Sequence, residues 1–343
     1  MAQKTPKFTF VSKEGKPLKL ALGDRIAQFL DSKRRERRAV KTISAYAQVL
    51  NQFEKWYIER EYDEINTEIL REYIEYLSFG KVRWDDHPTS PNGAKGLSPR
   101  TINNVIRNMR IFFNYLIEER VISYNPMEAV KYQAEAKDTF DIFTDDEVVK
   151  LLSAPNRRVY TGRRDYCMML LLCDTGLRIK ELTSLRVSDV NFKTRQIIVR
   201  AETSKTNMTR VVPISPLTAR ELENLISYMD VSEDDPLWLT QFGERYFGDT
   251  FAKMLKLYAK RVGVTGPRVS PHTFRHYFAV KFLREGGDAL TLARILGHTS
   301  LNMTQVYAKF TGTDIREQHD KASPISSLID KGNEKKRGKR IFR

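Results

Sequence analysis

The sequence predicts a mainly α-helical protein of two domains, with a small β-hairpin in the second domain. Apolar residues recur at three- or four-residue spacing through most of residues 22–127, which is typical of amphipathic helices that pack on a common core. Two β-branched runs, at 196–200 and 210–214, predict the strands of the hairpin. A polar segment without clear periodicity, residues 131–141, predicts the linker between the domains.

The first domain is expected to span residues 22–130, after a short N-terminal extension at 1–21. Within the extension, apolar and polar residues alternate on both sides of a Glu-Gly-Lys turn, so we expect a small hairpin there. Residues 80–97 contain several prolines and glycines and predict a long exposed loop. After this loop, Ser98 and Pro99 have the residue types of an N-cap and a first helical position, and they predict the start of the domain's last helix.

The second domain is expected to span residues 142–328. It opens at Thr144, whose hydroxyl is placed to cap a helix while Glu147 reaches back to the same turn. Residues 329–343 predict a flexible basic tail, because the stretch from Lys331 onward holds seven basic residues and one acidic residue. The chain of 343 residues has enough apolar content for a core in each domain.

The charge of the chain favours a polyanionic partner. Lys and Arg number 58 against 43 Asp and Glu, a formal net charge of +15, as expected for nucleic-acid binding, although ribosomal and membrane-surface proteins share this feature. The sequence has no run of about 18 apolar residues and its N-terminus lacks the apolar stretch of a secretory signal, so we expect a cytoplasmic protein without a membrane span. Cys167 and Cys173 lack the spacing of a zinc site, and buried reduced thiols are expected.

A tyrosine near the end of the second domain indicates chemistry. Tyr307 follows His298 by nine positions, and a His-x-x-Arg pair, His272 and Arg275, lies just upstream. A phenol, two imidazoles and a guanidinium are the groups needed to attack a phosphodiester without a metal, provided that arginine neutralises the phosphate oxygens and histidine or lysine handles protons. The chain is therefore a candidate for DNA strand chemistry.

Two further basic residues have both a functional and a plainer interpretation. Arg178 follows the turn at Gly176 and lies near a predicted helix N-terminus, where backbone donors also favour an anion. Taken alone, a surface salt bridge with Glu181 is the better interpretation of Arg178. Lys205 lies in the predicted hairpin turn, where its ammonium can protonate a leaving oxygen as a general acid. Most lysines in hairpin turns are only solvated, and the spacing alone does not favour the general-acid interpretation of Lys205.

Helical spacing places His272, Arg275 and His276 on one face of a helix. Two histidines four residues apart suit zinc, but the glutamate of a zinc-protease signature is absent and no third ligand is evident, so no metal is expected. A phosphate grip by His272 and Arg275 fits better, with His276 in a packing or supporting position. Residues 288–310 also look like a helix-turn-helix in which His298 is a turn residue, and the segment in isolation leaves both interpretations open.

Taken in order, these residues and their neighbours resemble the tyrosine recombinase, or phage integrase, family. The resemblance covers residues 140–325 through the motifs Thr-Gly-Leu-Arg-x-x-Glu-Leu, Ser-Lys-Thr ahead of Arg-x-Val-Pro-Ile, His-Thr-Phe-Arg-His, and Leu-Gly-His-Thr-Ser with the tyrosine. Residues 22–127 look like the family's core-DNA-binding domain, from their helical pattern alone. The implied architecture is a two-domain DNA clamp, with a helical core-binding bundle on one side of a duplex and an α-rich mixed catalytic domain on the other.

The resemblance implies that Tyr307 attacks the scissile phosphate, forming a 3′-phosphotyrosyl bond and releasing a 5′-hydroxyl. It implies that Arg178 and Arg275 hold the non-bridging oxygens. Lys205 is implied to protonate the leaving 5′ oxygen, and His272 to accept the phenol proton.

The remaining positions of the family pattern are also filled. His298 is implied to bind the phosphate and Glu181 to orient neighbouring groups, while His276 keeps a supporting position. Because the exchange of one phosphodiester for a phosphotyrosine conserves bond energy, neither ATP nor a metal ion nor another cofactor is expected. The lack of a Gly-Lys-Ser/Thr phosphate loop agrees with this expectation.

The implied partners are double-stranded DNA recombination sites, and the implied assembly is a homo-tetramer that exchanges strands between two duplexes through a four-way junction. Accessory DNA-bending or directionality proteins are further candidate partners. The extra segments at 1–21, 80–97 and 331–343 favour a mobile-element integrase or transposase. The alternatives are a chromosome-dimer resolvase of the same family, a type IB topoisomerase with the same active-site logic, and a non-catalytic helix-turn-helix regulator that binds DNA without covalent attachment.

Overall fold

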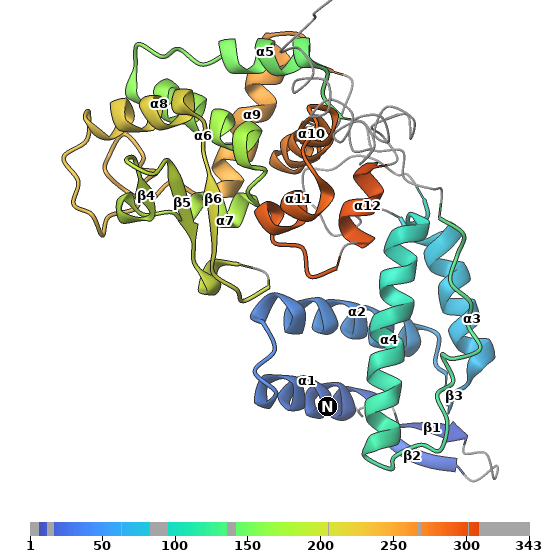
Figure 1. The fold of residues 1–343 in the computed structure, drawn as a ribbon. Coiled ribbons are helices and arrows are strands. Elements are labelled where there is room, and N and C mark those ends of the chain that lie inside the picture. The colour runs from blue at the N-terminus through green and yellow to red at the C-terminus, as the bar shows by residue number, and fades with distance from the viewer. Residues whose placement is uncertain are drawn as a thin grey trace, which may run out of the picture. The chain divides into compact units, whose positions relative to one another are not determined.

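The computed structural model describes residues 7–11, 17–62, 64–82, 95–135, 142–204, 206–265, 269–300 and 302–308. The chain divides into two compact units, Met1–Asp138 and Thr139–Arg343, each with a hydrophobic core of its own. Figure 1 shows that helices make up most of both units, so the predicted mainly helical fold class is confirmed. The predicted domain limits, 22–130 and 142–328, stay predictions.

Four predictions fall wholly or largely outside the described residues. They concern most of the loop at 80–97, the greater part of the linker at 131–141, the basic tail at 329–343, and Lys205 in the hairpin turn.

The first unit is built on helices whose periodic apolar residues are buried. Its described helices are α1 (Leu22–Arg35), α2 (Val40–Glu59), α3 (Thr67–Glu75) with a π-helical continuation (Tyr76–Gly80), and α4 (Pro99–Glu118). Phe29, Phe53 and Phe112 are fully buried in its core. As predicted, Ser98 caps α4: its Oγ accepts a hydrogen bond from the Thr101 amide at 3.3 Å.

The first unit also contains a small sheet. Strands β1 (Lys7–Val11) and β2 (Pro17–Ala21) pair antiparallel, which confirms the predicted N-terminal hairpin. On its other side β1 pairs in parallel with β3 (Glu64–Ile65), giving the order β2-β1-β3. This pairing joins the N-terminal strands to the segment between α2 and α3, because β3 precedes α3 directly.

The second unit combines helices with a short sheet. Its described α-helices are α5 (Asp145–Ser153), α6 (Tyr160–Thr175), α7 (Ile179–Thr183), α8 (Pro216–Ile226), α9 (Gly248–Arg261), α10 (Pro271–Arg284), α11 (Ala289–Leu296) and α12 (Asn302–Ala308). The sheet has the order β4-β5-β6, formed by β4 (Val190–Asn191), β5 (Gln196–Val199) and β6 (Arg210–Pro213). The predicted hairpin is therefore confirmed, and β4 extends it by one strand.

Helix α6 lies at the centre of the second unit. It is buried on nearly all sides, as an apolar helix inside a domain must be, and α8 and α10 pack against it. Its Cys167 and Cys173 are free thiols, of which Cys167 is buried, and burial raises the pKa of the Cys167 thiol to about 12. Thr144 and Glu147 form the predicted capping box at the start of α5. None of the described helices is long and apolar enough to cross a membrane.

Candidate active site

Two helices of the second unit end at glycines in the left-handed region. Helix α6 ends at Gly176 (φ +61°) and α11 ends at Gly297 (φ +64°), a conformation that glycine adopts without strain. A Cβ on Gly176 would lie 2.5 Å from the Phe278 ring, and one on Gly297 would lie 3.0 Å from the Arg210 guanidinium. These two turns lead directly to Arg178 and His298, so glycine is required where the chain enters the site.

A buried carboxylate holds two arginines. Glu181 on α7 is 1% exposed and accepts hydrogen bonds from Arg178 Nη1 (3.0 Å), Arg210 Nη1 (3.1 Å) and Arg210 Nη2 (2.8 Å). Burial opposes ionisation, but the hydrogen bonds and charge of Arg210, together with those of Arg178, outweigh it and lower the pKa of the carboxyl. The Arg178–Glu181 salt bridge of the plainer interpretation therefore exists, but it lies inside the site and not on the surface.

Arg275 is held by backbone carbonyls. It is 2% exposed, and its guanidinium donates to the Gly176 carbonyl (2.7 Å) and the Leu296 carbonyl (2.9 Å). The Leu296 carbonyl also accepts a hydrogen bond from Arg178 Nη1 at 3.4 Å. Burial, followed by the charge of Arg178, lowers the pKa of Arg275 to about 10, so the group stays charged at neutral pH.

His298 is a neutral imidazole held on both sides. Its Nε2 lies 3.0 Å from Arg275 Nη2, and its Nδ1 lies 2.8 Å from Thr304 Oγ1. Burial, followed by the positive charge of Arg275, Arg178 and Arg210, lowers the pKa of His298 to about 4. The ring is consequently uncharged at pH 7.

Tyr307 on α12 points into this group of residues. It is 6% exposed, its hydroxyl lies 2.9 Å from His276 Nδ1, and its ring lies nearly parallel to that of His298 with 6.3 Å between centroids. Burial raises the pKa of the phenol, while the charge of Arg275 and Arg178 and a hydrogen bond from Arg275 offset part of the rise. The hydroxyl is thus protonated at pH 7 and lies beside concentrated positive charge.

The two histidines of α10 lie in line with the phenol. The ring of His276, which contacts Tyr307, is 5.0 Å from the ring of His272 in an edge-to-face arrangement, and His272 is exposed. The supporting position predicted for His276 is therefore one of direct contact with the phenol. His272 lies one helical turn before His276 on α10, so the side chains follow one another in the order Tyr307, His276, His272.

Among the described residues, hydrogen bonds and ring contacts therefore connect a buried phenol, three guanidinium groups, three imidazoles and the carboxylate of Glu181. Two models of protein families match the chain: the phage integrase family over residues 141–312 and the phage integrase SAM-like domain over residues 22–134. The first match spans half of the chain. The chain belongs to the phage integrase family.

Curated relatives of this phage integrase family member are named tyrosine recombinases. Tyrosine recombinase XerC of Thermodesulfovibrio yellowstonii is 30% identical over 240 residues, which are 68% of this chain and 78% of that protein. Tyrosine recombinase XerD of Listeria monocytogenes is 28% identical over 293 residues, which are 83% of this chain and 93% of that protein. The similarity to tyrosine recombinases thus extends over most of the chain.

Solved structures share the fold of this chain. The Tn1549 transposon integrase, in complex with a circular intermediate DNA, matches with a TM-score of 0.64 and 21% identity over 82% of this chain and 94% of that chain. XerH site-specific recombinase, bound to a palindromic difH substrate after cleavage, matches with a TM-score of 0.65 and 18% identity over 90% of this chain and 86% of that chain.

The structure brings together the predicted site residues that it describes. The connected group, through hydrogen bonds or adjacent rings, comprises Arg178, Glu181, His272, Arg275, His276, His298 and Tyr307. The predicted roles of these residues stay predictions. Arg210 and Thr304 are not among the site residues that the sequence predicts. The only signals are the position of Arg210 in the Arg-x-Val-Pro-Ile motif and that of Thr304 one helical turn before Tyr307.

Within the part of the chain that the structure describes, no group of three or more His, Cys, Asp or Glu side chains is arranged to hold a metal ion. The expectation that the protein works without a metal stays a prediction.

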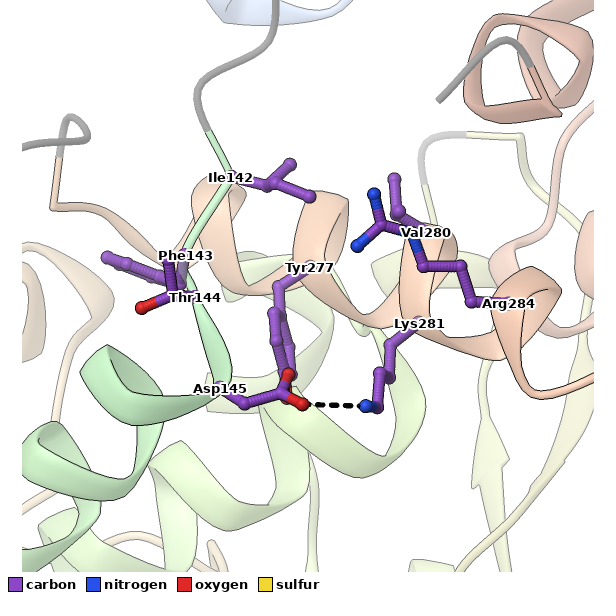
Figure 2. Close-up of a pocket in the computed structure, with 8 residues that line it drawn as sticks. All are labelled: Ile142, Phe143, Thr144, Asp145, Tyr277, Val280, Lys281 and Arg284. Carbon is purple, nitrogen blue, oxygen red and sulfur yellow. Dashed lines mark hydrogen bonds and ion pairs between the residues drawn. The ribbon is translucent and has the colours of Figure 1, made fainter. Parts of the chain in front are cut away.

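A cavity of about 320 Å³ lies along α10 beyond the site, where it meets the residues that lead into α5. Figure 2 shows Tyr277 and Lys281 pointing toward Asp145, which accepts hydrogen bonds from the Tyr277 hydroxyl (2.9 Å) and Lys281 Nζ (2.7 Å). Burial, followed by the contact with Asp145, raises the pKa of Tyr277. Tyr277 directly follows His276, but its hydroxyl is committed to Asp145, so Tyr307 is the better-placed phenol.

Proposed function

We propose that this chain is a site-specific DNA recombinase that cuts and rejoins strands through a 3′-phosphotyrosyl intermediate. The observation that carries the proposal is the Tyr307 phenol, buried beside Arg275 and His298 and in contact with His276. A phenol needs neighbouring positive charge and a proton acceptor to act as a nucleophile at neutral pH, and this site supplies both. The membership of the phage integrase family supports the same reaction.

In the proposed reaction, Arg178 and Arg275 hold the non-bridging oxygens of the scissile phosphate. The Leu296 carbonyl contacts both arginines. Arg275 is held by neutral carbonyl acceptors, so its positive charge remains available to the phosphate. Glu181 fixes Arg178 from the other side. His298 contributes a further hydrogen bond to the phosphate.

The proton of the phenol leaves toward the α10 histidines. We propose His272 as the proton acceptor, as the resemblance implies, and His276 as the residue that holds the phenol in the free protein, since its Nδ1 lies 2.9 Å from the hydroxyl. Lys205 protonates the leaving 5′ oxygen. The phosphodiester is exchanged for a phosphotyrosine, so the proposed cycle requires neither ATP nor a metal ion.

At the level of the molecule, we propose a two-domain clamp that works as a homo-tetramer on two DNA duplexes. Within the family we propose a mobile-element integrase or transposase. A chromosome-dimer resolvase differs from it in a measurable way, because it acts at one site of the host chromosome, whereas an integrase acts at the ends of an element.

Covalent attachment tests the reaction and its targets together. Nicked genomic DNA of the host is incubated with the protein and denatured, and the DNA that stays bound to protein is sequenced. We expect wild type to yield adducts at defined sites, and Tyr307→Phe, which removes one oxygen and almost no volume, to yield none despite unchanged binding in a gel shift. Binding without adducts from either protein contradicts the proposal and supports a regulator.

The sequences at the attachment points then separate the roles. Adducts at the ends of a mobile element support the integrase, and adducts at a single chromosomal site support the resolvase. Relaxation of supercoiled plasmids that lack a defined site would instead indicate a topoisomerase.

A further inference from the structure

Thr304 is a buried polar residue whose hydroxyl faces the site. It is 0% exposed, lies on α12 one turn before Tyr307, and its Oγ1 is 2.8 Å from His298 Nδ1. A buried hydroxyl in this position affects the imidazole directly, because it is the hydrogen-bonding partner of the ring nitrogen that faces away from Arg275.

The hydrogen bonds of the free protein fix the tautomer of His298. A guanidinium donates hydrogen bonds and cannot accept them, so Nε2, which faces Arg275 Nη2, must be the unprotonated nitrogen. Because the ring is neutral, Nδ1 carries the proton and donates to Thr304. In this state the threonine hydroxyl is an acceptor.

A bound phosphate requires the opposite tautomer. Its non-bridging oxygens only accept hydrogen bonds, so a His298 that contacts them through Nε2 must have the proton on Nε2. A neutral ring then has a bare Nδ1, which needs a donor. A hydroxyl can supply this donor by rotating about its Cβ–Oγ bond, since the same oxygen both donates and accepts.

We propose that Thr304 is a positioning residue that lets His298 exchange tautomers: its hydroxyl accepts from Nδ1 in the free protein and donates to Nδ1 when a phosphate occupies the site. The inference rests on the proposed function, because it takes the ligand of His298 to be a phosphate. Burial of the ring, followed by the charge of Arg275, Arg178 and Arg210, makes the alternative, a doubly protonated imidazolium, unfavourable.

The test is ¹⁵N NMR of the histidine rings at pH 7, in a phosphate-free buffer and then with added inorganic phosphate. The chain has five histidines, so the His298 signals are assigned by their loss in His298→Gln. For wild type we expect a protonated Nδ1 in the free protein and a protonated Nε2 with phosphate. Protonation of both nitrogens in the phosphate-bound protein, or an unchanged tautomer, would overturn the proposal.

Isosteric variants of Thr304 separate the effect of its hydroxyl from the effect of its packing. Thr304→Val keeps the shape and removes the hydroxyl, so we expect phosphate no longer to shift the proton cleanly to Nε2, whereas Thr304→Ser restores the shift. Thr183→Val is the matched control, because Thr183 is also buried in a helix of this unit but donates its hydroxyl to the Ile179 carbonyl. An identical response of Thr304→Val and wild type contradicts the inference.

Adduct formation at the mapped DNA sites distinguishes this inference from the proposed function. Thr304→Val should form adducts about two- to tenfold more slowly than wild type, the rate factor of roughly one lost hydrogen bond, and Thr304→Ser should recover most of the rate. If wild type itself forms no adducts, the proposed function fails, and the NMR result still decides the role of Thr304. If Thr304→Val matches wild type in rate, only the inference about Thr304 fails.

Discussion

Glu181 places a buried carboxylate between two guanidinium groups, so its charge supports both the site and the fold. We expect Glu181→Gln to destabilise the protein by about 3–5 kcal/mol at pH 7, because it leaves Arg178 and Arg210 close together without a counter-charge. Urea unfolding measures this loss. Glu285→Gln is the control in the same unit, since its exposed ion pair with Lys281 should contribute little to stability.

The effect of Glu181 should depend on pH. Its pKa is lower in the folded protein than in the unfolded chain. The stability that it contributes is therefore complete above the unfolded pKa and is lost as the pH falls through the folded pKa. The difference between wild type and Glu181→Gln should shrink in acid, and a difference that stays constant from pH 7 to about pH 3 would contradict this account.

The two histidines of α10 can be ranked by their effect on cleavage. If His272 is the proton acceptor, His272→Gln should slow adduct formation by roughly 10²-fold or more. His276→Gln should have the smaller effect, because it removes a contact that holds the phenol in the free protein. The measurement is the single-turnover rate at the mapped site, and the reverse order would assign proton acceptance to His276.

Some of the site residues could be predicted from the sequence and others could not. Tyr307 and Arg275 could be singled out because their chemical types and spacing are unusual for a plain surface. Arg210 and Thr304 could not, because an arginine in a strand and a threonine in a helix are common. Their importance comes from partners that only the fold supplies, Glu181 for Arg210 and His298 for Thr304.

At the scale of the elements, the end of α11 combines backbone strain with a side-chain contact. Gly297→Ala adds a Cβ at φ +64° and 3.0 Å from the Arg210 guanidinium. We expect a loss of about 1–2 kcal/mol from the left-handed backbone, and in addition slower adduct formation, because the displaced Arg210 no longer supports Glu181.

Gly263→Ala provides the matched comparison for this prediction. Gly263 has φ +70° after α9, and an added Cβ there meets nothing within 4 Å. It should therefore lose a similar stability in thermal or urea unfolding but form adducts at the rate of wild type. Equal rates for both variants would show that the contact with Arg210 is unimportant.

Regular elements were predictable where they are long. The helices with apolar spacing and their capping residues Ser98 and Thr144 could be predicted from local patterns. Strands β3 and β4 could not, because each has two residues, and two residues do not establish an alternation. These strands form because a longer neighbour is present to pair with them.

At the scale of the whole molecule, the net charge of +15 predicts strong dependence of DNA binding on salt. Deletion of residues 331–343 removes seven positive charges against one negative. We expect weaker binding to every DNA sequence and a smaller slope of log affinity against log salt concentration, since phosphate contacts carry no base readout. Fluorescence anisotropy across a salt series measures the slope, and an unchanged slope would mean that this segment does not touch DNA.

The Leu296 carbonyl, shared by Arg178 and Arg275, has a consequence for how an anion enters the site. A dipole at the C-terminus of α11 holds two like charges close together without cancelling either. Arg275 is held by carbonyls, so an incoming oxyanion does not have to displace a carboxylate from it, although Arg178 is paired with Glu181. The oxyanion also relieves the repulsion between Arg178 and Arg275. Folding brings the two positive charges together at a cost in electrostatic free energy. Binding of the anionic substrate then lowers that energy.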